Sequence, residues 1–433
     1  MADERTDQHR VRAATRATYI AFIGCGLVAA SWAARIPQVR DELGLSPSRL
    51  GLVLLAIAVG SLFALVASGH MVARFGSRLV VSAMALLLGL AVTTVAIGYH
   101  VGVPLVVVGL FLFGFANGAW DVAMNVQGAV VEQRLGKAIM PRFHAGYSIG
   151  TVAGALIGAG AVAVNLSVTP HLIITGLVIV ALVIYSVQYF VPDNPAADEA
   201  RAEATGAESG LRRTLATWRE PRTLLVGVFV LAFAFAEGTG IDWISVSVID
   251  DYGASATVGT LAFALFLTAM TVGRWFGPGL LDRYGRVRLL RVLAVISLAG
   301  LTLFVFGGST PLAFLGALFW GLGASLGFPV GMSAAADDPA RAAARVSVVA
   351  SIGYCAFLGG PPLVGFLGDH ITVQKGLSAV AVLLGIALAV ANAIRPLENA
   401  AADQVPAGQA PADQAMAGQA PTDQEPAAKT SGR

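Results

Sequence analysis

Two acids interrupt a long apolar stretch of the chain, residues 224–249, and are the first candidates for chemistry. Glu237 lies near the middle of the stretch, and Asp242 follows it within the same stretch. The stretch is long enough to cross a bilayer as a helix, which takes ~20 residues. A carboxylate at the bilayer centre costs roughly 2.5–3.5 kcal/mol, and such acids commonly transfer a proton, an ion or a substrate. We therefore interpret Glu237 as a proton-coupling acid; a protonated Glu237 hydrogen-bonded to a neighbouring helix is the structural alternative.

Asp242 and two glycines complete this candidate site. Asp242 lies about one and a half helical turns beyond Glu237, at a depth that water could reach. A further proton-coupling acid and an interfacial residue explain its position equally well. Gly238 and Gly240 directly follow Glu237. They predict a loosened helix whose backbone lines a cavity.

Three polar residues, Asn117, Asp121 and Asn125, repeat every four positions inside another apolar stretch. This spacing places them on one face of a helix. Because a polar stripe against lipid would be too costly, we expect the face to point into the protein. An interhelical hydrogen-bond ladder, worth about 1 kcal/mol per bond or less, would also explain it. We predict that Asp121 is a proton-coupling acid and that Asn117, Asn125 and Trp120 bind substrate.

The composition indicates which elements hold these residues. Of the 433 residues, 56% are hydrophobic and only 12% are charged, whereas a soluble domain has about 25% charged residues. The fold class is therefore predicted to be an all-α membrane protein. Twelve long apolar segments cover residues 18–34, 50–72, 79–98, 103–128, 143–164, 170–191, 223–249, 257–277, 289–307, 311–333, 346–368 and 376–394.

Basic residues are distributed unevenly over the loops between these segments. With a cytoplasmic N-terminus, the cytoplasmic side holds all but four of the 28 lysines and arginines; the exceptions are Arg35, Arg40, Arg49 and Lys375. Cytoplasmic loops of membrane proteins are enriched in Lys and Arg. We therefore predict a multi-pass membrane protein with both termini in the cytoplasm.

The chain contains a weak internal repeat. Residues 74–76 (Arg-Phe-Gly) follow the second segment, and residues 283–285 (Arg-Tyr-Gly) follow the eighth. Other identical residues recur in the same order at similar offsets, which indicates two six-helix halves. The predicted organisation is a cytoplasmic N-terminal segment (1–17), an N-terminal half (18–191), a cytoplasmic linker (192–222), a C-terminal half (223–396) and a disordered cytoplasmic tail (397–433).

Local signals refine the helices. Ser46 followed by Pro47 predicts a helix start. Glycines at every fourth position of residues 146–158 predict a close-packing helix face. The glycines and the proline within residues 321–329 favour close packing and a bend. The linker is predicted to contain a short interfacial helix around residues 211–219.

The two-half organisation, with a Gly-x-x-x-Asp-Arg-x-Gly-Arg type of loop after the second helix of each half, resembles the major facilitator superfamily over about residues 15–396. This resemblance implies a charge lock between the halves on the cytoplasmic side. Ala73 replaces the usual acid of the first copy, and Pro278 replaces the usual glycine of the second. The lock is therefore expected to depend more on the second copy. The predicted cytoplasmic gate residues are Arg74, Arg78, Asp282 and Arg283, together with Arg274, which is grouped with Asp282.

A narrower likeness rests on three stretches, residues 235–243, 320–329 and 345–362. They resemble the YbjJ-type inner-membrane carriers, a branch distantly similar to the proton-coupled fucose permeases. This resemblance implies that the protein lies in the bacterial inner membrane. Those permeases have functional acids in helices 1 and 4. Asp121 matches the helix 4 acid, whereas the helix 1 position, about Ala33, is apolar. The remaining substrate-binding candidates are Tyr147 and Tyr354.

Several function classes lack their motifs in this sequence. There is no Gly-Lys-Ser/Thr phosphate-binding loop and no histidine–cysteine cluster. The spacing Gly-x-Ser-x-Gly does occur, at residues 146–150 and 323–327, but inside apolar segments and not at the strand-to-helix turn that a nucleophile motif requires. Cys25 and Cys355 lie in apolar segments and are interpreted as small buried hydrophobes. We therefore predict that the protein is not an enzyme and uses no cofactor, metal or nucleic acid.

The sequence as a whole predicts a secondary active transporter that works by alternating access, as a monomer in the lipid bilayer. Its partners would be protons and a small-molecule substrate, with a sugar or sugar-like solute as the first hypothesis by resemblance. Protonation of Glu237 or Asp121 would change the relative stability of the inward and outward states.

Two alternatives stay open. Drug or metabolite efflux by proton antiport is weakened because the Arg-based antiporter motif of helix 4 is absent and Thr151 replaces the proline of the helix 5 motif. A membrane sensor that uses a transporter fold without transport is the other alternative. Two separate intramembrane acids argue against it.

Overall fold

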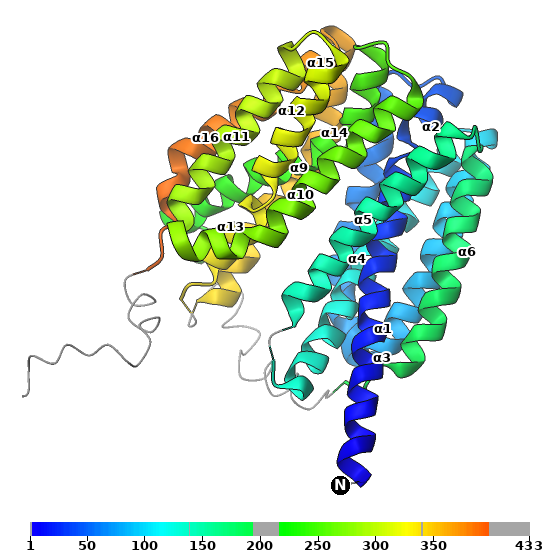
Figure 1. Cartoon of the computed structure of the whole chain (residues 1–433), viewed down its shortest axis with the longest axis vertical. Coiled ribbons are helices and arrows are strands. Elements are labelled where there is room, and N and C mark those ends of the chain that lie inside the picture. The colour runs from blue at the N-terminus through cyan, green and yellow to red at the C-terminus, as the bar shows by residue number, and fades with distance from the viewer. Residues whose placement is uncertain (1, 138, 194–215, 339–340, 398–433) are drawn as a thin grey trace, which may run out of the picture. The chain divides into compact units, whose positions relative to one another are not determined.

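The computed structural model describes residues 2–137, 139–193, 216–338 and 341–397, with side chains from Gln8 onward. All regular structure in these ranges is helical. Most of the predicted linker helix (211–219) and of the predicted tail (397–433) lies outside them. The N-terminal half consists of α1 (Ala2–Ala33), α2 (Ile36–Glu42), α3 (Pro47–Val101), α4 (Val103–Leu135), α5 (Met140–Ala163), α6 (Val168–Ser186) and η1 (Val187–Tyr189) (Figure 1).

The C-terminal half is built from a second set of helices. They are α9 (Pro221–Asp250), α10 (Ala256–Tyr284), α11 (Arg286–Phe306), α12 (Thr310–Ala324), α13 (Gly327–Ala335), α14 (Ala342–His370), α15 (Val373–Gly376), α16 (Ser378–Val390) and η2 (Ala391–Ile394). Figure 1 shows α1–α6 gathered in one bundle and α9–α16 in a second. The chain is thus divided into the two predicted bundles.

The number of membrane spans depends on one glycine. Eleven helices of the described residues are long and apolar enough to cross a membrane, and one of them, α3, has 55 residues. At ~1.5 Å per residue, such a helix is far longer than the ~30 Å core of a bilayer. Its backbone leaves helical geometry at Gly76, with φ 77° and ψ 156°. Dividing α3 there gives the twelve spans that the sequence predicts.

The same turn occurs in both halves, which confirms the repeat at backbone level. Gly285, between α10 and α11, has φ 75° and ψ 157°, close to the values of Gly76. A positive φ of this kind is accessible to glycine at little cost. In each copy the preceding arginine lies over the neighbouring ring, Arg74 at 5.6 Å from the Phe75 centroid and Arg283 at 5.3 Å from the Tyr284 centroid. The Arg-aromatic-Gly motif therefore reverses the direction of the chain in the same way in each half.

Small residues bring α1 and α5 together. A Cβ at Gly150 or Gly154 would collide with the backbone of Ile23 or Leu27, and a Cβ at Gly26 would collide with the carbonyl of Tyr147. The close-packing face predicted for residues 146–158 is therefore confirmed. Its effect is to place Cys25 of α1 beside Tyr147 of α5.

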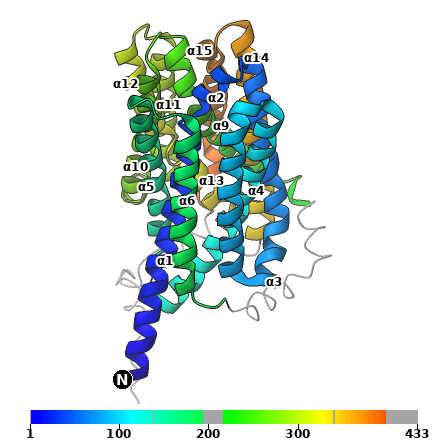
Figure 2. The same cartoon turned by 90° about the vertical axis from the view of Figure 1, so that its right-hand side faces the viewer.

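The two halves are joined at the end of the bundle where α2 and α15 lie (Figures 1 and 2). Both terminal nitrogens of Arg40 donate to the carboxylate of Asp250, with Nη2–Oδ1 at 2.9 Å. Asp369 accepts from the Ser46 hydroxyl at 3.2 Å and from the Ser48 amide at 3.3 Å. We call these five residues the latch.

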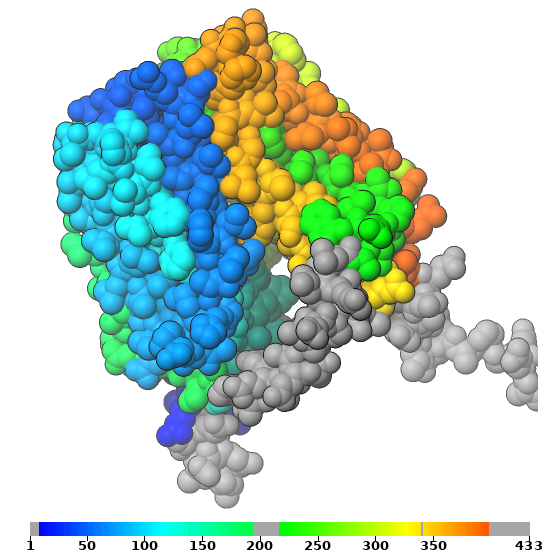
Figure 3. Space-filling model, turned by 180° about the vertical axis from the view of Figure 1, so that it is seen from behind, coloured from blue at the N-terminus to red at the C-terminus, as the bar shows by residue number. Residues whose placement is uncertain are grey.

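The opposite end holds the turns at Gly76 and Gly285. Seen from behind, the two halves are separated there by a hollow between α3, in blue, and helices α9 and α14, in green and yellow (Figure 3). The latch end is thus closed by contacts between the halves, while the Gly76 end is hollowed.

Candidate functional site

The predicted polar face of α4 is confirmed, and it contacts α1. The Cys25 thiol donates to Asn117 Oδ1 at 3.2 Å. Asn125 Nδ2 donates to the Asp121 carbonyl at 2.8 Å and lies 3.3 Å from its Oδ1. Although Asp121 is near the middle of a membrane-spanning helix, its side chain is exposed. A carboxylate exposed at this depth faces a space inside the protein.

Side chains from three other helices surround Asp121. Cys25 of α1, Tyr147 of α5 and Tyr354 of α14 all lie within its electrostatic range. Tyr147 also lies within electrostatic range of Glu237 and Arg274 in the C-terminal half. The two halves thus meet around one set of polar side chains. We call this set the central cluster: Cys25, Asn117, Asp121, Asn125, His144, Tyr147, Glu237, Arg274 and Tyr354.

Glu237 forms an ion pair that the sequence analysis did not anticipate. Arg274 Nη2 of α10 donates to Glu237 Oε1 at 2.8 Å and to Oε2 at 2.9 Å. The Glu237 side chain is 18% exposed and the Arg274 side chain is 30% exposed, so the ion pair is partly shielded from water. The prediction that grouped Arg274 with Asp282 is therefore wrong. Arg274 lies ten positions before the end of α10, inside the bundle, whereas Asp282 is exposed at that end.

Arg274 also contacts a break in a membrane-spanning helix. Its Nε donates to the Ser325 carbonyl at 3.2 Å. Ser325 lies between α12, which ends at Ala324, and α13, which begins at Gly327, so the predicted bend in residues 321–329 is a break. Broken helices leave carbonyls without intrahelical partners, and these need other donors in a membrane.

Local sequence explains why this contact forms. A Cβ at Gly273 would collide with the Ser325 side chain. The missing side chain at Gly273 lets the break approach α10 at the position next to Arg274. One guanidinium therefore holds the acid of α9 and the break between α12 and α13 at the same time.

The expectation that Gly238 and Gly240 loosen the helix is wrong. The helix α9 continues from Pro221 to Asp250 without a break. A Cβ at Gly240 would collide with the Phe266 ring, and one at Gly238 would press on the Phe357 ring at 3.2 Å. These glycines admit aromatic rings from α10 and α14, so their role is packing.

Trp120 and Cys355 also lie differently from their predictions. Trp120 is 0% exposed and shares the buried side of α4 with Ala116 and Ala123. It is rotated away from the face of Asp121 and cannot stack on a substrate in this conformation. Cys355, interpreted as buried, is exposed.

The remaining predicted residues divide between the site and the Gly76 end. Asp242 is half-buried, next to Trp243, which is completely buried. Tyr147 and Tyr354 are half-buried and belong to the central cluster. The predicted gate residues Arg74, Arg78, Asp282 and Arg283 are all exposed at the Gly76 end.

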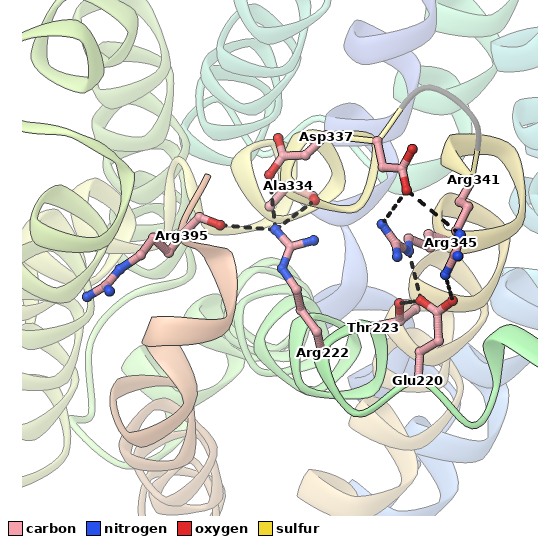
Figure 4. Close-up of polar contacts among 9 residues, drawn as sticks. Glu220, Arg222, Thr223, Ala334, Asp337, Arg341, Arg345 and Arg395 are labelled. Carbon is pink, nitrogen blue, oxygen red and sulfur yellow. Dashed lines mark hydrogen bonds and ion pairs between the residues drawn. The ribbon is translucent and has the colours of Figure 1, made fainter. Parts of the chain in front are cut away.

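A charged network at the Gly76 end was also missed by sequence analysis. Glu220, just before α9, accepts from Arg345 Nε at 2.8 Å and from Arg341 Nη1 at 3.1 Å (Figure 4). Burial opposes the charge of Glu220, but these arginines and Thr223 donate to it and keep its pKa below the usual value. Asp337 at the end of α13 forms further ion pairs with Arg222 and Arg286.

We expect Glu220→Gln to lower the stability of the C-terminal half by about 1 kcal/mol at neutral pH. A carboxyl whose folded pKa is depressed stabilises the protein above its unfolded pKa of ~4.3, and this contribution is lost as the pH falls through the folded pKa. Thermal unfolding of the purified protein should therefore show a gap between wild type and Glu220→Gln that narrows in acid. Asp282→Asn removes the same charge at an exposed site and is the control. A gap that stays constant with pH would contradict the assignment.

A family model described as "Major Facilitator Superfamily" matches residues 18–242 and 235–424. An uncharacterised MFS-type transporter of Yersinia pestis is 29% identical over 381 residues, which cover 87% of this chain and 94% of that protein. An uncharacterised transporter of Sinorhizobium fredii is 29% identical over 360 residues, which cover 82% of this chain and 90% of that protein.

Solved structures show the same fold at low identity. A variant of the nucleoside transporter NupG superposes with a TM-score of 0.72 at 14% identity, covering 88% of this chain and 98% of that one. A D-xylose-proton symporter gives 0.65 at 15% identity, with 89% and 97% covered. The Escherichia coli fucose:proton symporter gives 0.60 at 14% identity, with 88% and 98% covered.

Proposed function

The chain belongs to the major facilitator superfamily, and we propose that within it this protein is a proton-coupled secondary transporter of a small polar solute. The observation that supports the proposal best is the environment of the Asp121 carboxyl group. Its carboxyl group lies at membrane depth, exposed between the halves, and Asn125 is its hydrogen-bond partner in the described residues. A carboxylate at this depth without a cationic partner is costly, and uptake of a proton removes the cost.

The two acids have different roles in this proposal. Glu237 is ion-paired with Arg274, so its charge is already compensated within the C-terminal half. Asp121 has no such partner among the described residues and is the proton-coupling acid. We therefore assign proton coupling to Asp121. The role that we assign to Glu237 is to hold Arg274 in place.

The transport cycle in this proposal is alternating access. With the basic Gly76 end in the cytoplasm, as the charge distribution predicts, the structure is an inward-facing conformation closed by the latch. Outward opening would break the latch and bring the Gly76 end together. Asn117, Asn125, Tyr147 and Tyr354 would hydrogen-bond a polar solute. Solved structures with this fold include a D-xylose-proton symporter and a fucose:proton symporter. A sugar-like solute is therefore our first hypothesis.

The test uses purified protein in proteoliposomes with an imposed pH gradient. Labelled D-xylose, L-fucose, uridine and D-glucosamine are offered to wild type, Asp121→Asn and the control Glu42→Gln, which removes a charge at an exposed position of the latch end. We expect gradient-driven flux of at least one compound, lowered at least about tenfold in Asp121→Asn and unchanged in Glu42→Gln. Flux of such a compound that is independent of the gradient, or equal in Asp121→Asn, would contradict proton coupling at Asp121.

A further inference from the structure

The charges of the central cluster do not balance. Glu237 and Arg274 neutralise one another as an ion pair. This leaves the negative charge of Asp121, whose side chain is exposed, uncompensated. A space lined by one sign of charge with low-dielectric walls concentrates ions of the opposite sign and repels ions of the same sign. The central cluster therefore disfavours an anionic solute.

The elements packed around Asp121 supply hydrogen-bonding groups and no cation among the described residues. Cys25 faces it from α1, Tyr147 from α5 and Tyr354 from α14. On the remaining side, α3 packs Ser61 and Ala64 against Gly118 of α4. None of these groups is positively charged at neutral pH.

Arg274, the arginine of the central cluster, binds groups other than Asp121. Arg274 acts electrostatically on Tyr147 and His144, but its nitrogens donate to Glu237 and to the Ser325 carbonyl. Because both contacts belong to the C-terminal half, Asp121 is left as the open carboxylate of the N-terminal half.

Building on the proposed proton-coupled function, we propose that the transported solute carries a protonated amine and that this ammonium binds Asp121 in place of the coupling proton. An ammonium group has three N–H donors and no acceptor. Asp121 and Asn117 offer it oxygen acceptors on one face of α4, with the carboxylate supplying a charge-assisted hydrogen bond. The hydroxyls of Tyr147 and Tyr354 remain for polar groups elsewhere on the solute.

Proton and ammonium are then mutually exclusive ligands of one carboxylate, so the solute exchanges against a proton. Acid protonates Asp121 and removes the charge that binds the ammonium. The affinity for the amine is therefore expected to fall about tenfold for each pH unit below the range in which Asp121 takes up its proton. A neutral sugar, which does not need the charge, would not follow this dependence.

The test compares D-glucosamine with two neutral relatives, D-glucose and N-acetyl-D-glucosamine. Binding to the full chain in nanodiscs is measured as ligand-dependent thermal stabilisation at pH 7, where glucosamine is mostly an ammonium ion, and at pH 5. We expect glucosamine to bind at least about tenfold more tightly than either neutral sugar at pH 7, and to lose this preference at pH 5. Asp121→Asn should abolish the preference, and Glu42→Gln should retain it.

Two results would overturn the inference. One is glucosamine binding no more tightly to wild type than glucose does; because this comparison uses wild type alone, it is independent of whether the variant folds. The other is a preference for glucosamine that Asp121→Asn retains. If glucosamine shows no preference while proton-driven flux of a neutral sugar still requires Asp121, the amine inference fails and the proposed function stands. If glucosamine binds at Asp121 but no flux responds to a pH gradient, the proposed function fails instead.

Discussion

Arg274→Ala is expected to destabilise the protein more than Glu237→Gln, and more than both substitutions together. Removing the guanidinium leaves the Glu237 carboxylate and the Ser325 carbonyl without their donor. Breaking a buried ion pair from one side costs about 3–5 kcal/mol because a charge is left uncompensated. With side chains that are 30% and 18% exposed, we expect a smaller cost, about 1–3 kcal/mol. Thermal unfolding of the four proteins of this double-mutant cycle measures it.

The order of the variants separates a charge effect from a packing effect. Glu237→Gln keeps the side-chain volume and leaves Arg274 an oxygen acceptor, so its loss should be the smallest. In the double variant the neutral glutamine at position 237 has no charge to compensate, so part of the stability should return. Equal losses in Arg274→Ala and in the double variant would show that the guanidinium acts by packing alone.

Breaking the latch at Arg40 is expected to shift the protein toward a conformation that opens at the latch end. Arg40 and Asp250 form a two-pronged contact between α2 and α9, and such pairs are among the stronger charge-assisted contacts. A loss of ~1.4 kcal/mol would change the ratio of the two conformations tenfold. We expect a change of this order for Arg40→Ala. The charge exchange Arg40→Asp with Asp250→Arg should reverse it.

Distance measurements across the latch end provide the test. Spin labels at Glu42→Cys and Lys375→Cys, both exposed positions, report the separation of the halves once the exposed Cys355 is replaced by serine. Arg40→Ala should increase the population with a long separation, and Arg49→Ala, which leaves the latch contacts intact, should not. An unchanged distribution in Arg40→Ala would mean that the Asp369 contacts and the packing of Pro47 against Gly365 and Gly368 are enough to keep this end closed.

The features predicted correctly from sequence are those that depend on neighbours along the chain. The face of Asn117, Asp121 and Asn125 follows from helical periodicity. The Arg-aromatic-Gly motif that ends at Gly76 and Gly285 determines a turn within three residues. In each case the information lies within a few turns of the helix, so periodicity and residue type were sufficient.

The features that were missed depend on contacts between distant segments. Arg274 was assigned to the charges nearest in sequence, because nothing local indicates that Gly273 admits the break at Ser325 and turns the guanidinium toward Glu237. Two glycines so close together, Gly238 and Gly240, are typical of a loosened helix, but aromatic rings from two other helices fill the space beside them. The sequence did contain a signal for the contact of Arg40, because Arg40 is one of only four Lys and Arg residues on the side predicted to face away from the cytoplasm.

The single-residue turns at Gly76 and Gly285 have a mechanical consequence. Each turn links two long helices with no spare chain between them, so the helices of such a hairpin cannot slide past one another. Each hairpin therefore behaves as a rigid unit, and a local change in one half moves the whole of that half. A change of protonation at Asp121 is therefore not transmitted along the polypeptide to the other bundle. It has to pass through side chains that lie between the two halves, such as Tyr147, which is within electrostatic range of both Glu237 and Arg274.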